Sequence, residues 1–186
     1  SSETFACITM SPIVTPGRWG INKFSGGVFA LVGRVSSTSS AIIFVPYNAD
    51  CIGVLERNEF TCVDISGHEA STGAVNKFSG AVVDPNTGLV IFAPNDADCV
   101  GTFDAATSIF ACIDISATLT RNKKFRGAIV DPNTGLIIFV PSNADCVGIF
   151  NANSSTFACV DISAILPSNY KFDGAAVDPT TGLVVF

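Results

Sequence analysis

Three copies of a short Asn- and Asp-containing segment are the clearest candidates for chemistry in this 186-residue chain. Each copy reads Pro, any residue, Asn or Asp, Ala, Asp. The side chains with ligand oxygens are Asn48, Asp50, Asp96, Asp98, Asn143 and Asp145. Calcium takes carboxylate and carbonyl ligands, so a ring of these oxygens would form a calcium site. Asn and Asp also cap their own turns, and a role repeated in every copy favours this structural interpretation.

A lysine begins a second repeated motif, Lys-Phe-x-Gly. The lysines are Lys23, Lys77, Lys124 and Lys171. We expect them on the same face of the fold as the Asn and Asp side chains. Pairing of each ammonium group with an Asp of a neighbouring repeat is therefore the structural alternative to a metal site.

No constellation for nucleophilic or acid–base catalysis stands out, and we assign no catalytic residue. His68 is the single histidine; it lies in a Gly- and Ser-rich segment and is expected to be solvated. An enzyme needs residues that occur once and converge, whereas nearly all the acids here are repeated. This pattern favours a non-enzymatic protein and requires no cofactor.

Departures from the repeat are where added function is expected. Arg18 and Trp19 precede the first repeat and are residue types favoured as interface anchors. Asn153-Ser154-Ser155 is an N-glycosylation sequon.

Short strands must position all of these residues. In the second repeat we expect strands at residues 78–83, 89–93, 98–103 and 109–115, because β-branched and aromatic residues dominate them and no helical periodicity appears. Asp84-Pro85-Asn86-Thr87-Gly88 fits a hairpin loop between the first two. The sequence thus predicts an all-β fold of four-stranded antiparallel units that recur about every 47 residues.

The repeated pattern Lys-Phe-x-Gly-Ala-x-Val-Asp-Pro-Asn-Thr-Gly-Leu, followed by Pro-x-Asn-Ala-Asp, resembles kelch-like β-propeller repeats. It is similar to a poorly characterised group whose blades read roughly GGV-AP-GK-Y-IPYNA. The resemblance covers nearly the whole chain and implies a β-propeller rather than a parallel β-helix or a sandwich. It implies no activity.

The expected domain is a single propeller over residues 1–186, with full blades at 23–66, 77–116 and 124–163. Residues 1–11 match only the last strand of a blade, and residues 171–186 match only the first two strands. A closed ring needs the missing strand. We therefore expect the natural chain to continue past Phe186.

Six of the seven cysteines fall on the third and fourth strands of the blades. Hairpins turning at the midpoints would place them directly opposite one another, within disulfide range. The predicted disulfides are Cys51–Cys62, Cys99–Cys112 and Cys146–Cys159, with buried free thiols as the alternative. Cys7 is left unpaired, and its partner is expected on the missing strand. Disulfides indicate an oxidising compartment, either the cell exterior or an organelle lumen.

The amino-acid composition limits the kinds of partner that the chain is expected to bind. The net charge of −6 and the dispersed Lys and Arg residues argue against nucleic acid. Apolar runs are short and stopped by Pro or Gly, so we expect no membrane span.

The favoured function is a binding or structural scaffold that presents loops to a protein or glycan, for example as an accessory subunit. The alternative is a propeller hydrolase of the lactonase or glycosidase type, with a metal or carboxylate site at the channel mouth.

Overall fold

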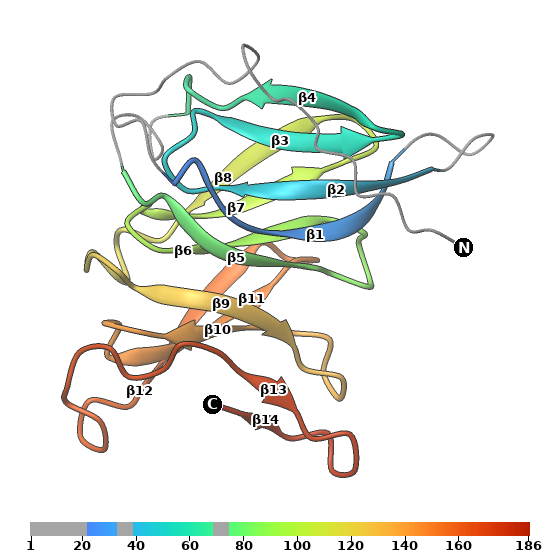
Figure 1. Cartoon of the computed structure of the whole chain (residues 1–186). Helices are drawn as coiled ribbons and strands as arrows, with labels where there is room; N and C mark the ends of the chain where they lie inside the picture. The colour runs from blue at the N-terminus through green and yellow to red at the C-terminus, as the bar shows by residue number, and fades with distance from the viewer. Residues whose placement is uncertain (1–21, 33–38, 69–74) are drawn as a thin grey trace, which may run out of the picture.

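Strands make up the regular secondary structure of the described residues, as the sequence predicts (Figure 1). The computed structural model describes residues 22–32, 39–68 and 75–186. The strands are β1 (Phe24–Val32), β2 (Ser39–Pro46), β3 (Cys51–Glu56), β4 (Glu59–Asp64), β5 (Phe78–Val83), β6 (Val90–Pro94), β7 (Cys99–Asp104), β8 (Ile109–Asp114), β9 (Phe125–Val130), β10 (Ile137–Pro141), β11 (Cys146–Asn151), β12 (Thr156–Asp161), β13 (Ala176–Val177) and β14 (Val184–Val185). Across these described ranges, no helix has the length and apolar character needed to cross a membrane.

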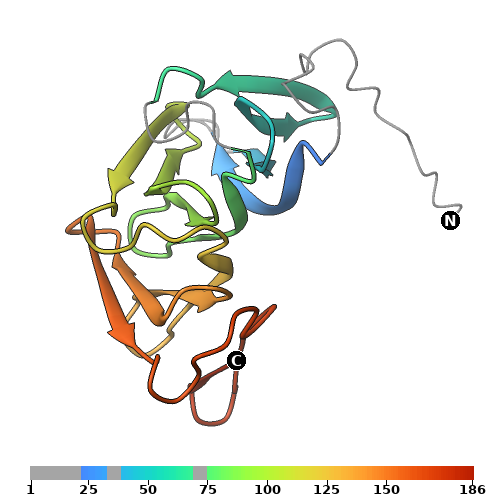
Figure 2. The same cartoon turned by 90° about the vertical axis from the view of Figure 1, so that its left-hand side faces the viewer.

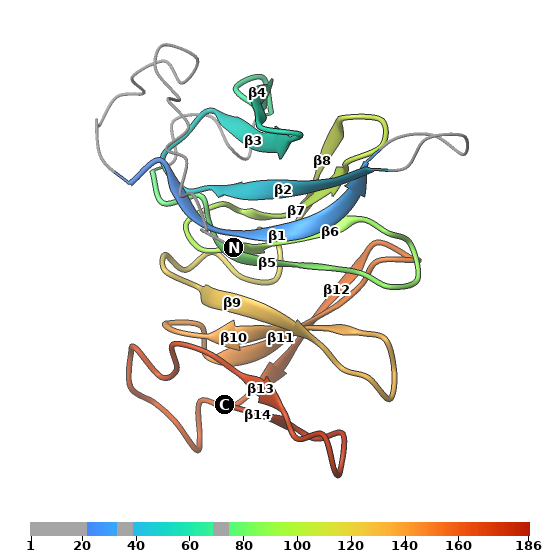
Figure 3. The ribbon, with the colours of Figure 1, turned by 45° about the vertical axis from the view of Figure 1, so that its right-hand side comes forward.

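Consecutive strands pair antiparallel into three four-stranded blades, numbered 1 to 3 in chain order, and β13 pairs with β14. The blades and the two-stranded sheet follow one another along an arc (Figure 2). The first strands of the blades, β1, β5 and β9, lie side by side on the concave side of the arc, as Figure 3 also shows. The fourth strands, β4, β8 and β12, lie on the outside.

The Asp-Pro-x-Thr-Gly loops close the hairpin between the first two strands. In blade 2 the Asp84 carboxylate accepts hydrogen bonds from the Thr87 hydroxyl (2.6 Å) and the Thr87 N–H (3.0 Å). Gly88 has a φ of +74°, a conformation that glycine adopts without steric cost. The same loop recurs at Asp131 and Asp178. These loops confirm the expected hairpins, while the corresponding segment of blade 1 falls within residues 33–38, outside the described ranges.

Each blade packs three phenylalanine rings around a glycine of its third strand. In blade 2, a Cβ on Gly101 would lie 3.0 Å from the side chains of Phe78 and Phe92 and 3.1 Å from that of Phe110. The rings of Phe78 and Phe92 are 5.6 Å apart and fully buried. The equivalent glycines are Gly53 and Gly148. Without a side chain at this position, the rings can close over the strand.

Apolar side chains fill the spaces between successive blades. Ile43 of blade 1 and Phe103 of blade 2 belong to one core, and Ile91 of blade 2 and Phe139 of blade 3 belong to the next. All four are fully buried, and each burial stabilises the fold by about 1.5–3 kcal/mol. The blades are therefore held together mainly by face-to-face apolar packing.

Disulfides join the third and fourth strands of each blade. They are Cys51–Cys62, Cys99–Cys112 and Cys146–Cys159, the three predicted bridges, with Cα–Cα separations of 5.4 or 5.5 Å. Bridges of this kind persist in oxidising compartments.

The predicted register of these cysteines is wrong by two residues. Cys99 lies opposite Asp114, and Cys112 lies opposite Gly101. In blade 2 the hairpin turns through four residues, 105–108, because the Asp104 carboxylate accepts hydrogen bonds from the Ala106 N–H (2.9 Å) and the Thr107 hydroxyl (2.7 Å). In blade 1 the same shift accompanies a two-residue turn, with Glu56 opposite Glu59. The bridged cysteines are diagonal neighbours, which strand twist brings within bonding distance.

Some predictions fall on residues that the structure does not describe. The isolated strand at residues 1–11, the unpaired Cys7 and the interface pair Arg18 and Trp19 all lie outside the described ranges and stay predictions. Asn153 is described: it is exposed at the tip of the β11–β12 hairpin, where a glycan could be attached.

Candidate functional site

A lysine crosses each junction between described blades. Lys77 Nζ, at the start of blade 2, donates hydrogen bonds to Asp50 Oδ1 (3.0 Å) and the Ala49 carbonyl oxygen (3.2 Å) of blade 1. Lys124 of blade 3 bonds Asp98 of blade 2 in the same way (3.1 Å). The lysine side chains are 2% and 0% exposed, whereas the Asp side chains are about half exposed. The ammonium groups are thus the buried partners of interblade ion pairs.

The third residue of each Pro-x-Asn/Asp-Ala-Asp segment accepts a hydrogen bond from the next repeat. Asn48 Oδ1 accepts a hydrogen bond from the Asn76 N–H (2.8 Å), and Asp96 Oδ1 accepts one from the Lys123 N–H (2.7 Å). Both donors have a positive φ. The side-chain oxygen therefore fixes a strained residue at the entry to the inner strand.

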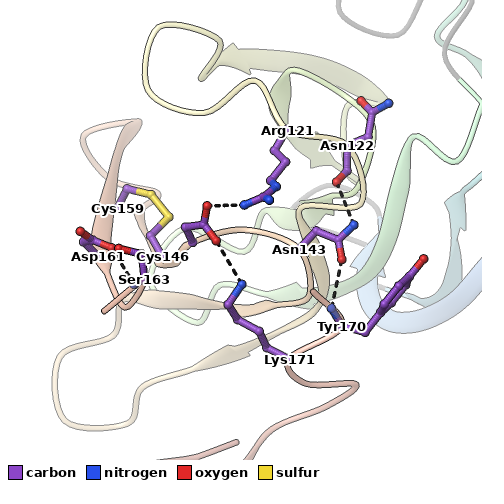
Figure 4. A network of polar contacts seen from close by, with 10 residues as sticks. Arg121, Asn122, Asn143, Cys146, Cys159, Asp161, Ser163, Tyr170 and Lys171 are labelled. Atoms are coloured by element: carbon purple, nitrogen blue, oxygen red, sulfur yellow. Dashed lines mark hydrogen bonds and ion pairs between the residues drawn. A yellow bond between two sulfur atoms is a disulfide. The ribbon is translucent and has the colours of Figure 1, made fainter. Parts of the chain in front are cut away.

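Figure 4 shows the third junction. Lys171 Nζ lies 3.3 Å from Asp145 Oδ1, while Arg121 bonds the other oxygen of the same carboxylate. Asn143 Oδ1 accepts a hydrogen bond from the Tyr170 N–H (3.1 Å). The three junctions therefore use the repeated Asn and Asp side chains in the same way.

The acidic side chains of the described ranges do not cluster into a metal site. No group of three or more His, Cys, Asp or Glu side chains in residues 22–32, 39–68 and 75–186 could hold a metal ion. Each of the repeated Asn and Asp side chains bonds a neighbouring repeat. Calcium binding by their oxygens stays a prediction.

Lys23 differs from the other three motif lysines. Its Nζ is buried, and it has no hydrogen-bond partner among the described residues. A buried ammonium group without a carboxylate is unfavourable, because its desolvation is not compensated.

A cavity of about 520 Å³ is lined by residues at the start of the inner strands β1, β5 and β9. Two repeat positions supply its polar walls: the third residue of Lys-Phe-x-Gly and the second residue of Pro-x-Asn/Asp-Ala-Asp. The residues are Ser25, Ser79, Arg126, Asp173, Tyr47 and Asn95. All are different in type from their counterparts in neighbouring repeats, except the two serines. We call this the axial cavity.

Glycines bring the inner strands together at this cavity. Gly80 has a φ of +84°, and a Cβ built on it would lie 2.8 Å from the Cα of Gly127 in the next blade. Only glycine fits such an approach of two backbones. Gly80 thus sets how closely blades 2 and 3 meet, and the preceding residue, Ser79, lines the axial cavity.

Charged groups gather at one end of the axial cavity. Arg126 Nη1 lies 2.5 Å from Asp173 Oδ1, and the Arg126 guanidinium carbon lies 5.5 Å from the centre of the Tyr170 ring. Lys123 Nζ donates to Tyr170 Oη (3.0 Å). This hydrogen bond lowers the pKa of Tyr170 and raises the pKa of Lys123. The tyrosine therefore lies between two cations.

Asn95 lines the cavity but is only 3% exposed, and its Oδ1 has no hydrogen-bond partner among the described residues. Buried polar groups are nearly always hydrogen-bonded, so this oxygen is an exception. It is enclosed by protein and does not form part of the open cavity wall.

Sequence reasoning missed this cavity because it sought function in repeated residues and in insertions. The signal was available within the chain. Aligning the four Lys-Phe-x-Gly motifs with one another leaves the x position as the one that varies, with Ser25, Ser79, Arg126 and Asp173. Variation inside an otherwise fixed motif marks the positions that the scaffold does not need.

His68 is not the solvated loop residue that the sequence suggested. Its ring packs edge-on against Phe110 of blade 2, with centroids 4.8 Å apart. A second cavity, of about 680 Å³, lies beside it and is lined in part by Asp98 and Asp114. His68 is the last described residue before the gap at 69–74, so no site is assigned there.

No family model matches the chain, and no curated protein matches it either. The chain does match solved structures. A streptogramin B lyase structure superposes with a TM-score of 0.51 at 19% identity, over 79% of this chain and 43% of that chain. Virginiamycin B lyase from Staphylococcus aureus gives 0.50 at 17% identity, over 77% and 42%. Its catalytically inactive variant with quinupristin gives 0.51 at 17% identity, over 80% and 44%.

The fold is a β-propeller. At these identities the likeness concerns the fold alone, and the chain spans less than half the length of each of these structures.

Proposed function

We propose that the chain is a non-enzymatic binding propeller that presents its axial cavity and the adjoining loops to a protein or glycan partner. The observation that supports this function most is the gathering of non-repeated polar side chains around one cavity. Repeated side chains, by contrast, are used in the blade junctions. A scaffold that holds its fixed residues internally and varies only those facing a cavity is suited to recognition.

The charges of the cavity favour binding over catalysis. Asp173 is the acidic side chain in its described wall, and it is paired with Arg126. The Asp173 carboxylate is already engaged by the Arg126 guanidinium, and no second acidic side chain lines the described wall. The cavity therefore provides hydrogen-bonding groups without an acid–base pair.

The setting proposed for this function is secreted or lumenal, with the chain serving as an accessory subunit of a larger assembly. The three disulfides and the exposed Asn153 sequon support it. The kelch-like repeat pattern, and one propeller domain over residues 1–186, belong to the same proposal.

Parallel screens of a random-peptide display library and a glycan array test the binding function. We expect ligands from at least one screen whose affinity falls tenfold or more in Arg126→Ala. The absence of any ligand, or ligands that bind Arg126→Ala as they bind wild type, would overturn the proposal.

The second candidate is a propeller enzyme. It is favoured by the lyase activity named for the structures with the same fold. Incubating the chain with quinupristin and with panels of lactones and glycosides, followed by mass spectrometry, separates the two functions. Product formation that is lost in Asp173→Asn would replace binding with catalysis.

A further inference from the structure

We infer that the axial cavity binds an uncharged sugar residue at the end of a glycan, an inference that rests on the proposed binding function. Two features of the wall carry it: a compensated ion pair, and hydroxyl groups beside aromatic rings. Each feature suits a ligand that donates and accepts hydrogen bonds but carries no net charge.

The ion pair selects against charged ligands. An anion approaching Arg126 also meets the Asp173 carboxylate, which is 83% exposed, and a cation approaching Asp173 meets the guanidinium group. A neutral diol avoids both penalties. Arginine has five N–H donors, and its bond to Asp173 leaves others free, while the carboxylate keeps acceptor capacity. Adjacent sugar hydroxyls can accept from one and donate to the other.

Uncharged polar side chains make up the rest of the polar wall. Ser25 and Ser79 line the same wall, and their hydroxyls both donate and accept. A sugar can satisfy these groups together because its hydroxyls point in several directions around one ring.

An aromatic wall accommodates the apolar face of a sugar. Tyr47 and Phe24 line the cavity, and tyrosine combines an apolar ring with a polar end. The volume of about 520 Å³ falls within the roughly 300–1,000 Å³ typical of small-ligand sites. Protein partners instead anchor through large side chains in desolvated pockets, which this polar wall does not provide.

A glycan array with uncharged, sialylated and sulfated termini tests the inference. We expect wild type to bind a subset of the uncharged termini and to be competed by the matching free monosaccharide. Arg126→Ala is expected to lose tenfold or more in affinity. Arg121→Ala is the matched control, because Arg121 also pairs with an Asp but does not line the cavity. Its binding should equal that of wild type.

Asp173→Asn tests the charge argument separately. It leaves the Arg126 charge uncompensated, so selectivity should shift toward sialylated or sulfated termini. Thermal melting shows whether each variant is folded. If Arg126→Ala does not fold, Arg126→Lys replaces it in the affinity measurement.

The outcomes distinguish the inference from the proposed function. Two outcomes would overturn the inference of an uncharged sugar ligand but leave the binding function standing. The first is wild-type binding to charged termini alone. The second is binding of peptides that depends on Arg126, with no glycan bound. No ligand of either class would overturn both.

Discussion

The blade junctions and the axial cavity use neighbouring positions of the same repeat but follow opposite rules. At the junctions, Lys77 and Lys124 make the same buried contacts with the preceding blade. Two residues later, Ser79 and Arg126 face the cavity and share no chemistry. A repeat protein can therefore hold its architecture and its recognition surface in one short motif: the lysine lies just before the inner strand and bonds the preceding blade, whereas the cavity residue lies within the strand.

The largest expected effect comes from the glycine that serves both regions. Gly80→Ala should destabilise the fold by about 3 kcal/mol, because a left-handed conformation and a backbone clash add together. Gly88→Ala is the matched control: its φ is also positive, but nothing lies within 4 Å of the added Cβ. A cost of about 1 kcal/mol is expected there. Urea unfolding measures both, and equal costs would mean that the close approach of the blades is not needed.

The junction lysines should affect stability but not ligand binding. Lys124→Met should lower the free energy of unfolding by about 1–3 kcal/mol, because it leaves the Ala97 carbonyl without its bond. Lys123→Met, at the neighbouring surface position, should change stability by less than about 0.5 kcal/mol. Loss of glycan binding in folded Lys124→Met would contradict the separation of the two regions.

Lys23 provides a contrast to Lys124. Its Nζ has no hydrogen-bond partner among the described residues, so Lys23→Met breaks no described bond and should lower the free energy of unfolding by less than Lys124→Met does. Thermal melting of the two methionine variants side by side measures the contrast. If Lys23→Met is destabilised like Lys124→Met, the ammonium group has a carboxylate partner in the folded protein.

A smaller effect is expected from pH. The Ser66 N–H donates to Asp64 Oδ1 (2.8 Å) and lowers the pKa of Asp64 in the folded state; Asp114 and Asp161 are held in the same way. The unfolded state then binds protons first as pH falls, so stability is retained above about pH 4 and declines as pH falls through the lower folded pKa. Urea midpoints across this range should decline less in Asp64→Asn. If the urea midpoint of Asp64→Asn declined with pH as steeply as that of wild type, this turn would not contribute to the pH dependence of stability.

The smallest expected effect is that of calcium. The repeated Asn and Asp oxygens bond the next blade, so added calcium should shift the melting temperature by less than about 1 °C. A larger shift, absent in Asp96→Asn, would favour the oxygen ring over the junction as their main role.

Local chemistry explains what the sequence could predict. Asp84-Pro85 to Gly88 specifies its hairpin within five residues, and repetition carries that result along the chain. The cysteine pairs were predictable, but their register was not, because Asp104 builds a four-residue turn from side-chain bonds. The axial cavity depends on how blades meet at Gly80 and Gly127, a contact between segments 47 residues apart.

Among the described strands, the outermost strand of each blade has a neighbour on one side only, and strands in that position fray first. β12, for example, pairs only with β11 among them and is largely exposed. Its disulfide to β11 prevents the strand from peeling away by itself, since Cys146 and Cys159 must move together. Proteases need a locally unfolded, extended segment to cleave. The rim of the propeller is therefore built to withstand digestion in an oxidising environment, and reduction should expose the outer strands to cleavage before the inner ones.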